Sequence, residues 1–499
     1  MKQHQKLNAV KSLKQSEPLV ELGIESGRPQ SPDLSQYGRV AVIGAGPAGL
    51  KCAVGLNELG IDVDVFEAQS KIGGRIQSRV DSRGIIFEDG GHLINDDHLA
   101  ILRDAEKYNL ELTEYYPEEQ GSCLLGYNIN EIDRDRTEIA IAIENLTADL
   151  RSALELLSGP DAEHYINKFS NLNLEEYLNS VEIPQWAKDT LSAHVKAELG
   201  AGPKDVDTLT FMGFQYEKMT KENPRWVFSG YGRFSLAEGM SSLTKAYASE
   251  IQDKIHTEHA LKAIRKVGEE YYLVFSHNGE TSVKVYDYLA LCLPYSALKN
   301  VDLSESGFKF KRIRAINELP YGKEEKINFE STQVPHYNDP DADVILIDDF
   351  DGGNPAYVWN NKRDEGASGD VVRSVFASDM PALKEKYGNE DVIAEVGRSK
   401  LRKILPNTYN GKAHLSNWGE NEYIGGSYST PLPGQTIELL DGFSSKENNR
   451  VFFGGEHIGL GKGRKHAAFM NGAVESGDYM KDQLLGNMVL NGPKIKSAA

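Results

Sequence analysis

The sequence predicts an α/β fold, and three features of its N-terminal part carry this prediction. An apolar segment at residues 40–43 has the composition of a buried strand. A glycine-rich turn follows it, and apolar residues then recur with helical spacing from Ala48 to Leu59. A second apolar segment, IDVDVFE, ends at Glu67. A strand, a helix and a second strand in this order form a βαβ unit, which implies a parallel sheet.

The glycine-rich turn predicts that this unit binds a dinucleotide. Gly44, Gly46 and Gly49 have the G-x-G-x-x-G spacing. The first glycine allows the turn, the second lets a pyrophosphate approach the backbone, and the third lets the helix pack close to the strand. Glu67 is placed to accept hydrogen bonds from a ribose hydroxyl. Because both strands, the helix and the acid stand in register, we expect a Rossmann-like dinucleotide-binding domain rather than a chance glycine turn.

Composition and charge narrow the range of partners. The chain of 499 residues has a formal net charge of -19, with 40% hydrophobic and 26% charged residues. These fractions are ordinary for a globular protein, whereas the negative charge would repel nucleic acid and anionic membrane surfaces. We therefore expect a cationic or neutral small molecule as the partner, and no nucleic acid.

Cysteine usage and the N-terminal segment bear on the compartment. Cys52, Cys123 and Cys292 lie far apart, without the spacing of a metal site or of a disulfide framework. We therefore expect no metal, and a reducing compartment, the cytoplasm. Residues 1–35 contain no apolar run as long as a signal peptide or a membrane span, and no later segment reaches the length of a span. These first residues are expected to form an N-terminal arm.

The residues that follow the acid indicate which dinucleotide is bound. Gly73, Gly74 and Arg75 come shortly after it, and the segment EDGGHLI then supplies acids and a glycine pair. Here the sequence resembles the flavin-containing amine oxidase family, whose N-terminal part has this βαβ unit, then G-G-R, then an acid and two glycines. The resemblance implies that the dinucleotide is FAD, that Arg75 approaches its pyrophosphate, and that the glycine-pair segment runs beside the flavin.

A second part of the flavin domain is expected near the C-terminus. The segment RVFFGGEH predicts a strand at residues 451–453, a glycine turn and then Glu456, with a helix from about Ala468. This resembles the family's closing motif, in which that glutamate contacts the ribityl and phosphate part of the cofactor. The cofactor contacts implied by the resemblance are Gly44, Gly46, Ala48, Gly49, Glu67, Ala68, Arg75, Gly90, Gly91, His92, Leu93, Leu261, Glu456 and Met470. Ser427 stands where some members carry a cysteine that binds the flavin covalently, so we expect noncovalent FAD.

The segment YGKEEKINFE raises the question of whether Lys326 does chemistry. Its alternation predicts a half-buried strand with Ile327 and Phe329 on the apolar face and Lys326, Asn328 and Glu330 on a polar exterior. That pattern alone makes Lys326 a solvated surface lysine. The resemblance implies the opposite, because in the family a lysine at this point reaches toward flavin N5. In a partly dry pocket such a lysine can act in proton transfer or assist the reaction with oxygen.

Two aromatic residues are expected to line the substrate site. The segment NWGENEYIGGSYSTPLPG resembles a family motif whose aromatic residue, here Tyr428, forms one wall of a cage against the flavin. The start of the C-terminal helix supplies the opposite wall, here Phe469. Two parallel rings would exclude water and align a neutral amine. The alternative is that both residues are ordinary core aromatics.

Basic residues could decide between an amine and an amino acid. Related amino acid oxidases have a carboxylate-binding arginine after the glycine pair, where this chain has His92 and Leu93. The difference favours an amine, unless Arg233 or Arg464 substitutes. Lys462, Arg464, Lys465 and His466 predict a surface loop, or a cation that meets an anionic part of the substrate.

These expectations combine into one reading of the chain. The fold is α/β, with a Rossmann-like FAD-binding domain (36–95, 235–298 and 440–487) interleaved with an α+β substrate-binding domain (96–234 and 299–439). An N-terminal arm (1–35) and a C-terminal tail (488–499) flank them. The expected reaction is FAD-dependent oxidation of an amine C–N bond by O2, with Lys326, Tyr428 and Phe469 in catalysis and a possible homodimer. The alternatives are an L-amino-acid oxidase, an oxygen-independent FAD desaturase and a non-catalytic FAD-binding protein.

Overall fold

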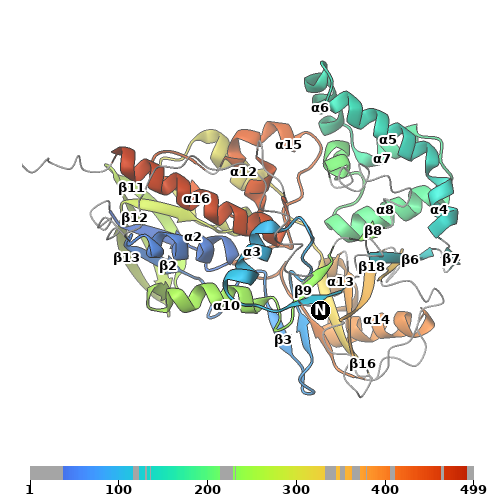
Figure 1. Ribbon diagram of the computed structural model, residues 1–499, viewed down its shortest axis with the longest axis horizontal. Helices are drawn as coiled ribbons and strands as arrows, with labels where there is room; N and C mark the ends of the chain where they lie inside the picture. The colour runs from blue at the N-terminus through green and yellow to red at the C-terminus, as the bar shows by residue number, and fades with distance from the viewer. Residues whose placement is uncertain are drawn as a thin grey trace, which may run out of the picture. The chain divides into compact units, whose positions relative to one another are not determined.

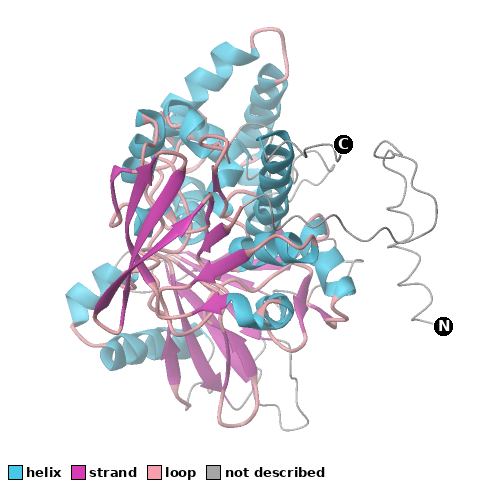
Figure 2. Ribbon diagram, turned by 90° about the vertical axis from the view of Figure 1, so that its left-hand side faces the viewer, coloured by secondary structure: helices cyan, strands magenta, loops and turns pink. Residues whose placement is uncertain are grey.

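The computed structural model describes residues 38–115, 123–129, 132–134, 136–213, 229–230, 232–331, 344–348, 354–361, 371–377, 379–404, 411–444, 446–461 and 466–491. They belong to one compact unit, which spans residues 35–499. The predicted N-terminal arm, the C-terminal tail beyond residue 491 and three basic residues, Lys462, Arg464 and Lys465, lie outside the described residues. Figure 2 shows helices and strands interspersed, as expected of an α/β fold.

A five-stranded parallel sheet confirms the predicted βαβ unit. Its order is β10-β2-β1-β14-β21. The bounds are β1 Val40–Ile43, β2 Val63–Phe66, β10 Ile255–His256, β14 Tyr288–Leu291 and β21 Val451–Phe453. Every adjacent pair runs parallel. Because all five strands are parallel, their carboxyl ends meet at one edge of the sheet, although the strands come from distant parts of the sequence.

Two long helices cover one face of this sheet. Helix α2 (Pro47–Glu58) begins directly after the glycine turn, with Pro47 at its first position, and α16 (Met470–Asn491) packs along it. Figure 1 shows the two helices, blue and red, side by side. The two helices can approach closely because Gly477 has no side chain. A Cβ at this position would lie 2.5 Å from the carbonyl oxygen of Ala48. The sequence prediction placed the start of α16 at about Ala468, two residues early.

The opposite face of the parallel sheet packs against a mixed sheet of order β13-β12-β11-β15, in which β11, β12 and β13 are antiparallel and β15 runs parallel to β11. The bounds are β11 Ala260–Val267, β12 Glu270–His277, β13 Glu280–Tyr286 and β15 Asp302–Glu305. Buried side chains from both sheets form one apolar cluster between them, including Ile43, Leu289, Ile264 and Leu273. This cluster anchors the strands that end at the predicted cofactor site.

The other large sheet has the order β20-β16-β19-β18-β17-β6-β7, with β8 paired to β6. Its bounds are β6 Cys123–Ile129, β7 Ile132–Arg134, β8 Ser229–Gly230, β16 Glu325–Ser331, β17 Val344–Ile347, β18 Ala356–Asn361, β19 Val371–Ala377 and β20 Ala413–Leu415.

Helices cover both faces of this second sheet. On one side lie α4 Arg136–Ala142, α5 Glu144–Leu157, α6 Ala162–Asn171, α7 Leu174–Ser180 and α8 Gln185–Leu199, which Figure 1 shows gathered together. They share a core with Leu346, Tyr357 and Trp359. On the other side α13 Met380–Tyr387 and α14 Glu390–Ile404 pack over Ile327 and Phe329.

The remaining elements connect these layers. They are β3 Ser78–Val80, β4 Ile86–Glu88, β5 Leu112–Glu114, β9 Phe234–Leu236, α3 Leu99–Lys107, α10 Ser241–Glu250, α11 Tyr295–Leu298, α12 Phe310–Glu318, α15 Gln435–Glu438, and the 3-10 turns Gln252–Lys254, Leu440–Phe443 and Glu456–Leu460. Within the described part of the chain, none of the helices combines the length and the apolar character that crossing a bilayer requires.

Burial of β16 corrects one prediction. Lys326 and Asn328 were expected on a polar exterior if the alternation alone decided, but Lys326 is 5% exposed and Asn328 is fully buried. The reason is tertiary: β16 lies between β19 and β20, and its polar face is covered by the glycine-pair segment. Asn328 donates to the carbonyl oxygen of Glu88, and Lys326 to that of Gly90. Glu330 remains partly exposed and bonds His414.

Candidate active site

A large cavity opens where the parallel strands end. It encloses about 1490 Å³, including the solvent at its mouth. Ten of the fourteen predicted cofactor contacts line it: Gly44, Gly46, Ala48, Glu67, Ala68, Arg75, Gly91, Leu261, Glu456 and Met470. Tyr428 and Phe469, the two predicted cage residues, line the same cavity. Segments separated by about 400 residues in the sequence therefore meet around one space, as expected at the carboxyl edge of a parallel sheet.

The glycine turn has the geometry that a phosphate cradle needs. Gly44 has φ +103°, a conformation that disfavours any side chain. A Cβ on Gly49 would lie 2.0 Å from the carbonyl oxygen of Gly44, so this glycine is required for close packing. Gly46 differs, because a Cβ there would meet no atom within 4 Å and would project into open space. The N-terminus of α2 and the bare backbone at Gly46 thus face the cavity and suit an anion.

Glu67 lines the cavity at the end of β2. Its carboxylate accepts hydrogen bonds from the backbone N–H of Ala45 at 2.9 Å and of Gln69 at 3.0 Å. Burial raises its pKa, and these backbone donors counteract part of that rise.

Arg75 and Glu456 form the link between the two halves of the cavity wall. Arg75 Nη1 lies 3.0 Å from Glu456 Oε1 and donates to the carbonyl oxygen of Ser427 at 2.6 Å. Glu456 also accepts from Ser429 and from the backbone N–H of Ala468. Burial alone would raise the pKa of Glu456, but the positive charge of Arg75 together with the hydrogen bonds from Arg75 and Ser429 and the nearby His457 outweighs it, so the net pKa is lowered. This carboxylate therefore holds three segments together while it lines the cavity.

Lys326 lies directly behind the cavity wall. Its Nζ donates to the carbonyl oxygen of Gly90 at 2.6 Å and lies 5.3 Å from the centre of the Trp359 ring. Its neighbour across the cavity wall, Gly91, lines the cavity, whereas Lys326 itself does not. A Cβ on Gly91 would lie 2.3 Å from Met470 Sδ, so only glycine fits between the backbone here and the Met470 side chain.

Three of the predicted cofactor contacts, Gly90, His92 and Leu93, do not line the cavity, and the packing explains each case. Gly90 is pressed against the backbone, because a Cβ there would lie 1.9 Å from the carbonyl oxygen of Arg75. His92 turns away and bonds the hydroxyl of Tyr115 through Nε2 at 3.0 Å. Leu93 packs on the helical core beside Tyr115. Together with Gly49 they shape the wall from behind, and a direct cofactor contact from them stays a prediction.

The cage residues have different surroundings. Phe469 packs edge-on against His98, with ring centres 5.3 Å apart. Tyr428 is held by its backbone, since its carbonyl oxygen accepts the N–H of Gly322 at 2.8 Å. Both line the same cavity, and their roles as opposite, parallel walls of a cage stay a prediction.

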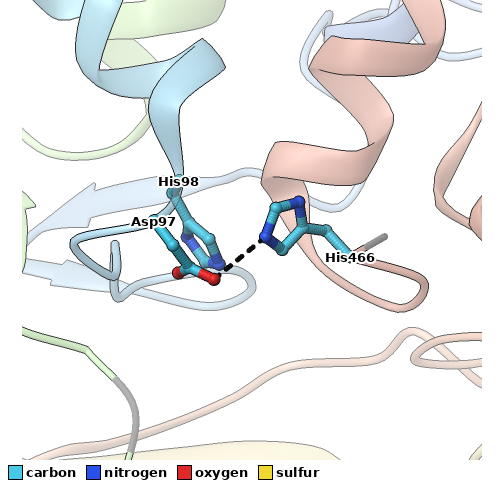
Figure 3. Close-up of side chains that lie close together, drawn as sticks. All are labelled: Asp97, His98 and His466. Carbon is cyan, nitrogen blue, oxygen red and sulfur yellow. Dashed lines mark hydrogen bonds and ion pairs between the residues drawn. The ribbon is translucent and has the colours of Figure 1, made fainter. Parts of the chain in front are cut away.

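A histidine and aspartate cluster lies beside Phe469. Figure 3 shows Asp97, His98 and His466 converging from the start of α3 and from the loop before α16. His466 Nε2 lies 3.2 Å from Asp97 Oδ2, and His466 Nδ1 lies 3.2 Å from Glu475 Oε2. Burial lowers the pKa of His466, but the two carboxylates outweigh it and raise the value to about 9. His466 is therefore an imidazolium that ties the two segments together.

The spacing of this cluster would accommodate a metal ion. The hydrogen bonding opposes one, because His98 Nδ1 accepts the backbone N–H of Asn95 at 3.1 Å. The neutral ring must then carry its proton on Nε2, which has no hydrogen-bond partner among the described residues, so in this tautomer neither ring nitrogen has a free lone pair for a metal. Burial lowers the pKa of His98 to about 4, so the ring is neutral. These residues form an ion-pair cluster rather than a metal centre.

Arg233, the possible carboxylate clamp, is already paired. Its guanidinium lies 3.2 Å from Asp96 and 3.0 Å from Glu114, and it stacks on Phe234. Two carboxylates neutralise it, so it is a weak candidate for binding a substrate carboxylate.

The sequence reasoning missed Glu324. This side chain is fully buried behind Ser427 and Tyr428, and Ser427 Oγ donates a hydrogen bond to it. Burial raises its pKa to about 8. A signal was present, since two acids directly precede Lys326 in a strand that the resemblance had already placed in the interior.

The comparisons with known proteins agree with this geometry. The sequence pattern of the family described as flavin containing amine oxidoreductase matches residues 47–479. Among curated proteins, an L-amino-acid oxidase of Trimeresurus stejnegeri is 21% identical over 471 residues, which covers 88% of this chain and 86% of that protein. A pseudooxynicotine dehydrogenase of a Pseudomonas species is 21% identical over 455 residues, covering 87% and 84%.

Solved structures show the same fold. The cyclohexylamine oxidase of Brevibacterium oxydans superposes with a TM-score of 0.73 at 15% identity, covering 91% of this chain and 99% of that one. A putrescine oxidase bound to putrescine gives a TM-score of 0.72 at 15% identity, covering 90% and 99%.

Proposed function

Because this chain belongs to the family of flavin-containing amine oxidoreductases, we propose that it is an FAD-dependent oxidase acting on the C–N bond of an amine. The observation that carries the proposal is the cavity itself. One continuous space is lined by the glycine turn at Gly46, by the acid Glu67 and by the aromatic residues Tyr428 and Phe469. A site for a dinucleotide and a site for a small organic substrate therefore adjoin.

The residues present fit FAD. The α2 N-terminus at Gly46 would hold the pyrophosphate, Glu67 the adenosine ribose, and Leu261 and Ala68 the adenine side of the cavity. When bound, FAD supplies the acceptor for the hydride next to the substrate nitrogen and passes the electrons on to O2, which yields hydrogen peroxide.

The proposal includes noncovalent attachment of FAD. Ser427 has no thiol to form the link, and its hydroxyl is engaged with Glu324. Cys292 also lines the cavity, but burial holds its pKa well above the usual value, so it remains a thiol and a poor nucleophile.

The side chains around the cavity would prepare the amine for oxidation. Tyr428 and Phe469 exclude water and align the substrate, and the buried Lys326 is positioned to hold or move a proton at the wall beside Gly91. The imine product is then hydrolysed by water. This leaves a carbonyl compound and ammonia or an amine.

An amine is favoured over an amino acid by the state of Arg233. An L-amino-acid oxidase remains the second candidate, because that is the name of several relatives. A substrate carboxylate would need a cation. Of the two candidates, Arg233 is occupied by Asp96 and Glu114, and Arg464 lies outside the described residues. The buried lysine at the cavity wall favours an oxidase over a desaturase or a non-catalytic flavoprotein.

The test is anaerobic mixing of the purified protein with panels of amines and of L-amino acids, while the flavin absorbance is followed. We expect bleaching by an amine, recovery on admitting O2 with one hydrogen peroxide per turnover, and FAD released intact by denaturation. Bleaching by amino acids alone would favour the second candidate, and a protein that no compound reduces would refute both.

We further propose a cytoplasmic protein that forms a homodimer. The acidic charge and the free thiols of Cys52 and Cys292 support a reducing compartment, and closed dimers are the commonest oligomers. Light scattering after gel filtration tests the dimer, and fractionation of the source cells tests the location.

A further inference from the structure

The buried acid Glu324 lies in a slot that the backbone builds for it. A Cβ on Gly200, which ends α8, would lie 2.0 Å from Glu324 Oε2, and a Cβ on Gly322 would lie 2.2 Å from the same atom. Gly200 also has φ +58°, so two separate segments lack a side chain where this carboxyl group sits. Such a slot indicates a positioned group rather than an accidental burial.

The carboxyl group is hydrogen-bonded to the hydroxyls of Ser427 and Tyr428, but one of its two oxygens is left over. Ser427 Oγ donates to Oε2, whereas Oε1 is buried without a hydrogen-bond partner among the described residues. An unsatisfied buried carboxyl oxygen costs on the order of 1–3 kcal/mol. Buried polar groups that lack a hydrogen-bond partner, and buried groups with shifted pKa values, are found preferentially at functional sites.

Its neighbours place the acid next to the substrate space. Ser427 and Tyr428 both line the cavity, and Glu324 lies directly behind them. Tyr428 and Glu324 are electrostatically coupled: after burial, Glu324 is the largest cause that raises the pKa of the Tyr428 hydroxyl. A charge on Glu324 is therefore felt at the cage wall.

The other titratable groups around it do not neutralise it. From α8, Glu198 adds a second acid and raises the pKa of Glu324 further. From β18, Tyr357 lies near Tyr428 and is hydrogen-bonded to His194 of α8. From its own strand, Lys326 points to Gly90, and Arg75 is bound to the acid Glu456.

We propose that Glu324 is the group that selects positively charged substrates: ionised, it places a negative charge behind Tyr428, and a cation bound in the cavity drives its proton out to solvent. The inference rests on the proposed function in that the cation is the amine substrate. Glu324 acts through Tyr428 and Ser427 and is a specificity-determining residue. The exchange is balanced, because one cation enters the site as one proton leaves it.

The experiment uses the FAD-loaded protein and benzyltrimethylammonium, a cation with no proton of its own and no lone pair for oxidation. Calorimetric titration at pH 7 in phosphate and in Tris gives the number of protons released on binding. We expect about one proton per site from the parent protein and none from Glu324→Gln. At pH 9, where Glu324 is ionised in the parent, Glu324→Gln should bind the cation about a hundredfold more weakly, because the cation must favour the ionised acid by about that factor to release nearly one proton at pH 7. Infrared titration should show a carboxylic acid band that disappears as pH rises through about 8 in the parent and is missing in Glu324→Gln.

Glu438→Gln is the matched control, because it removes an acid whose side chain is 55% exposed and pairs with Arg314 on the surface. It should behave as the parent in every measurement. Equal proton release and equal affinity in the parent and in Glu324→Gln would overturn the inference, as would failure of the cation to bind to a protein whose flavin amines reduce. Proton release by a protein that no amine reduces would keep the charge selection and refute the proposed oxidase.

Discussion

The two ends of the cavity are built in different ways. The end at Gly44, Gly46 and Gly49 is made of backbone: a turn, a helix N-terminus and close packing that only glycine permits. The end at Lys326 and Tyr428 is made of side chains, which reach the cavity wall from segments far apart in the sequence.

This difference shows which kind of site can be predicted from sequence. A backbone site within one βαβ unit is encoded by residues a few positions apart, so its spacing can be read directly. A side-chain site depends on which strands become neighbours and on what covers them. Four experiments, on the glycine turn, Lys326, His466 and added metal, test that contrast.

Gly49→Ala and Gly46→Ala separate packing from binding at the backbone end. A Cβ at Gly49 would overlap the carbonyl oxygen of Gly44, so we expect a loss of about 1–3 kcal/mol in the free energy of unfolding. A Cβ at Gly46 meets only open space and leaves the fold intact, but it occupies the surface meant for the pyrophosphate. Urea denaturation of the apoprotein and FAD titration measure the two quantities. Equal stability of both variants, or full FAD affinity of Gly46→Ala, would contradict this account.

Lys326→Met tests the side-chain end. Removing a positioned proton-transfer group typically costs about 10²–10⁴-fold in rate, so we expect retained FAD and a slowed reduction or reoxidation of the flavin in stopped-flow traces. Lys323→Met is the control, because Lys323 is exposed three residues earlier in the same segment. If both half-reactions of Lys326→Met keep the rates of the parent, the lysine has no part in the chemistry.

The His466 cluster predicts a pH-dependent stability. The pKa of His466 is about 9 in the folded protein against 6.5 for the free group, so its contribution is fully present below pH 6.5 and is lost as pH rises through 9. Partial exposure of Asp97 and Glu475 reduces the effect to about 1 kcal/mol. His466→Asn keeps a residue that tolerates the positive φ of 60°. Denaturation curves should differ between the parent and this variant at pH 6 and converge at pH 10.

Metal treatment should have the smallest effect. Since His98 Nδ1 accepts a backbone hydrogen bond and the neutral ring carries its proton on Nε2, added Zn²⁺ or a chelator should shift the melting temperature of the tag-free protein by less than about 1 °C. A melting temperature that climbs with zinc concentration would show that the cluster binds metal after all.

Individual residues show how far prediction from sequence reached. The glycine turn, Glu67 and Arg75 were found because local spacing and a resemblance pointed to them, and all of them shape the cavity. For Lys326 the alternation pattern alone predicted a solvent-exposed side chain. A period-two pattern shows which residues share a face of a strand, but it does not show what covers that face. Glu324 was missed, because its slot is formed by Gly200 and Gly322 and by the loop at Ser427, which no short window contains.

The sequence by itself determined the βαβ unit, the need for glycine in its turn, and the kind of ligand that such a turn holds, because these properties arise from steric and hydrogen-bonding rules that act over a few residues. Only the tertiary structure decided that β16 is covered on both faces, that Arg233 is paired and that His98 carries its proton on Nε2. Burial and pairing depend on groups brought together from distant parts of the chain, and it is burial and pairing that set the charge of a side chain.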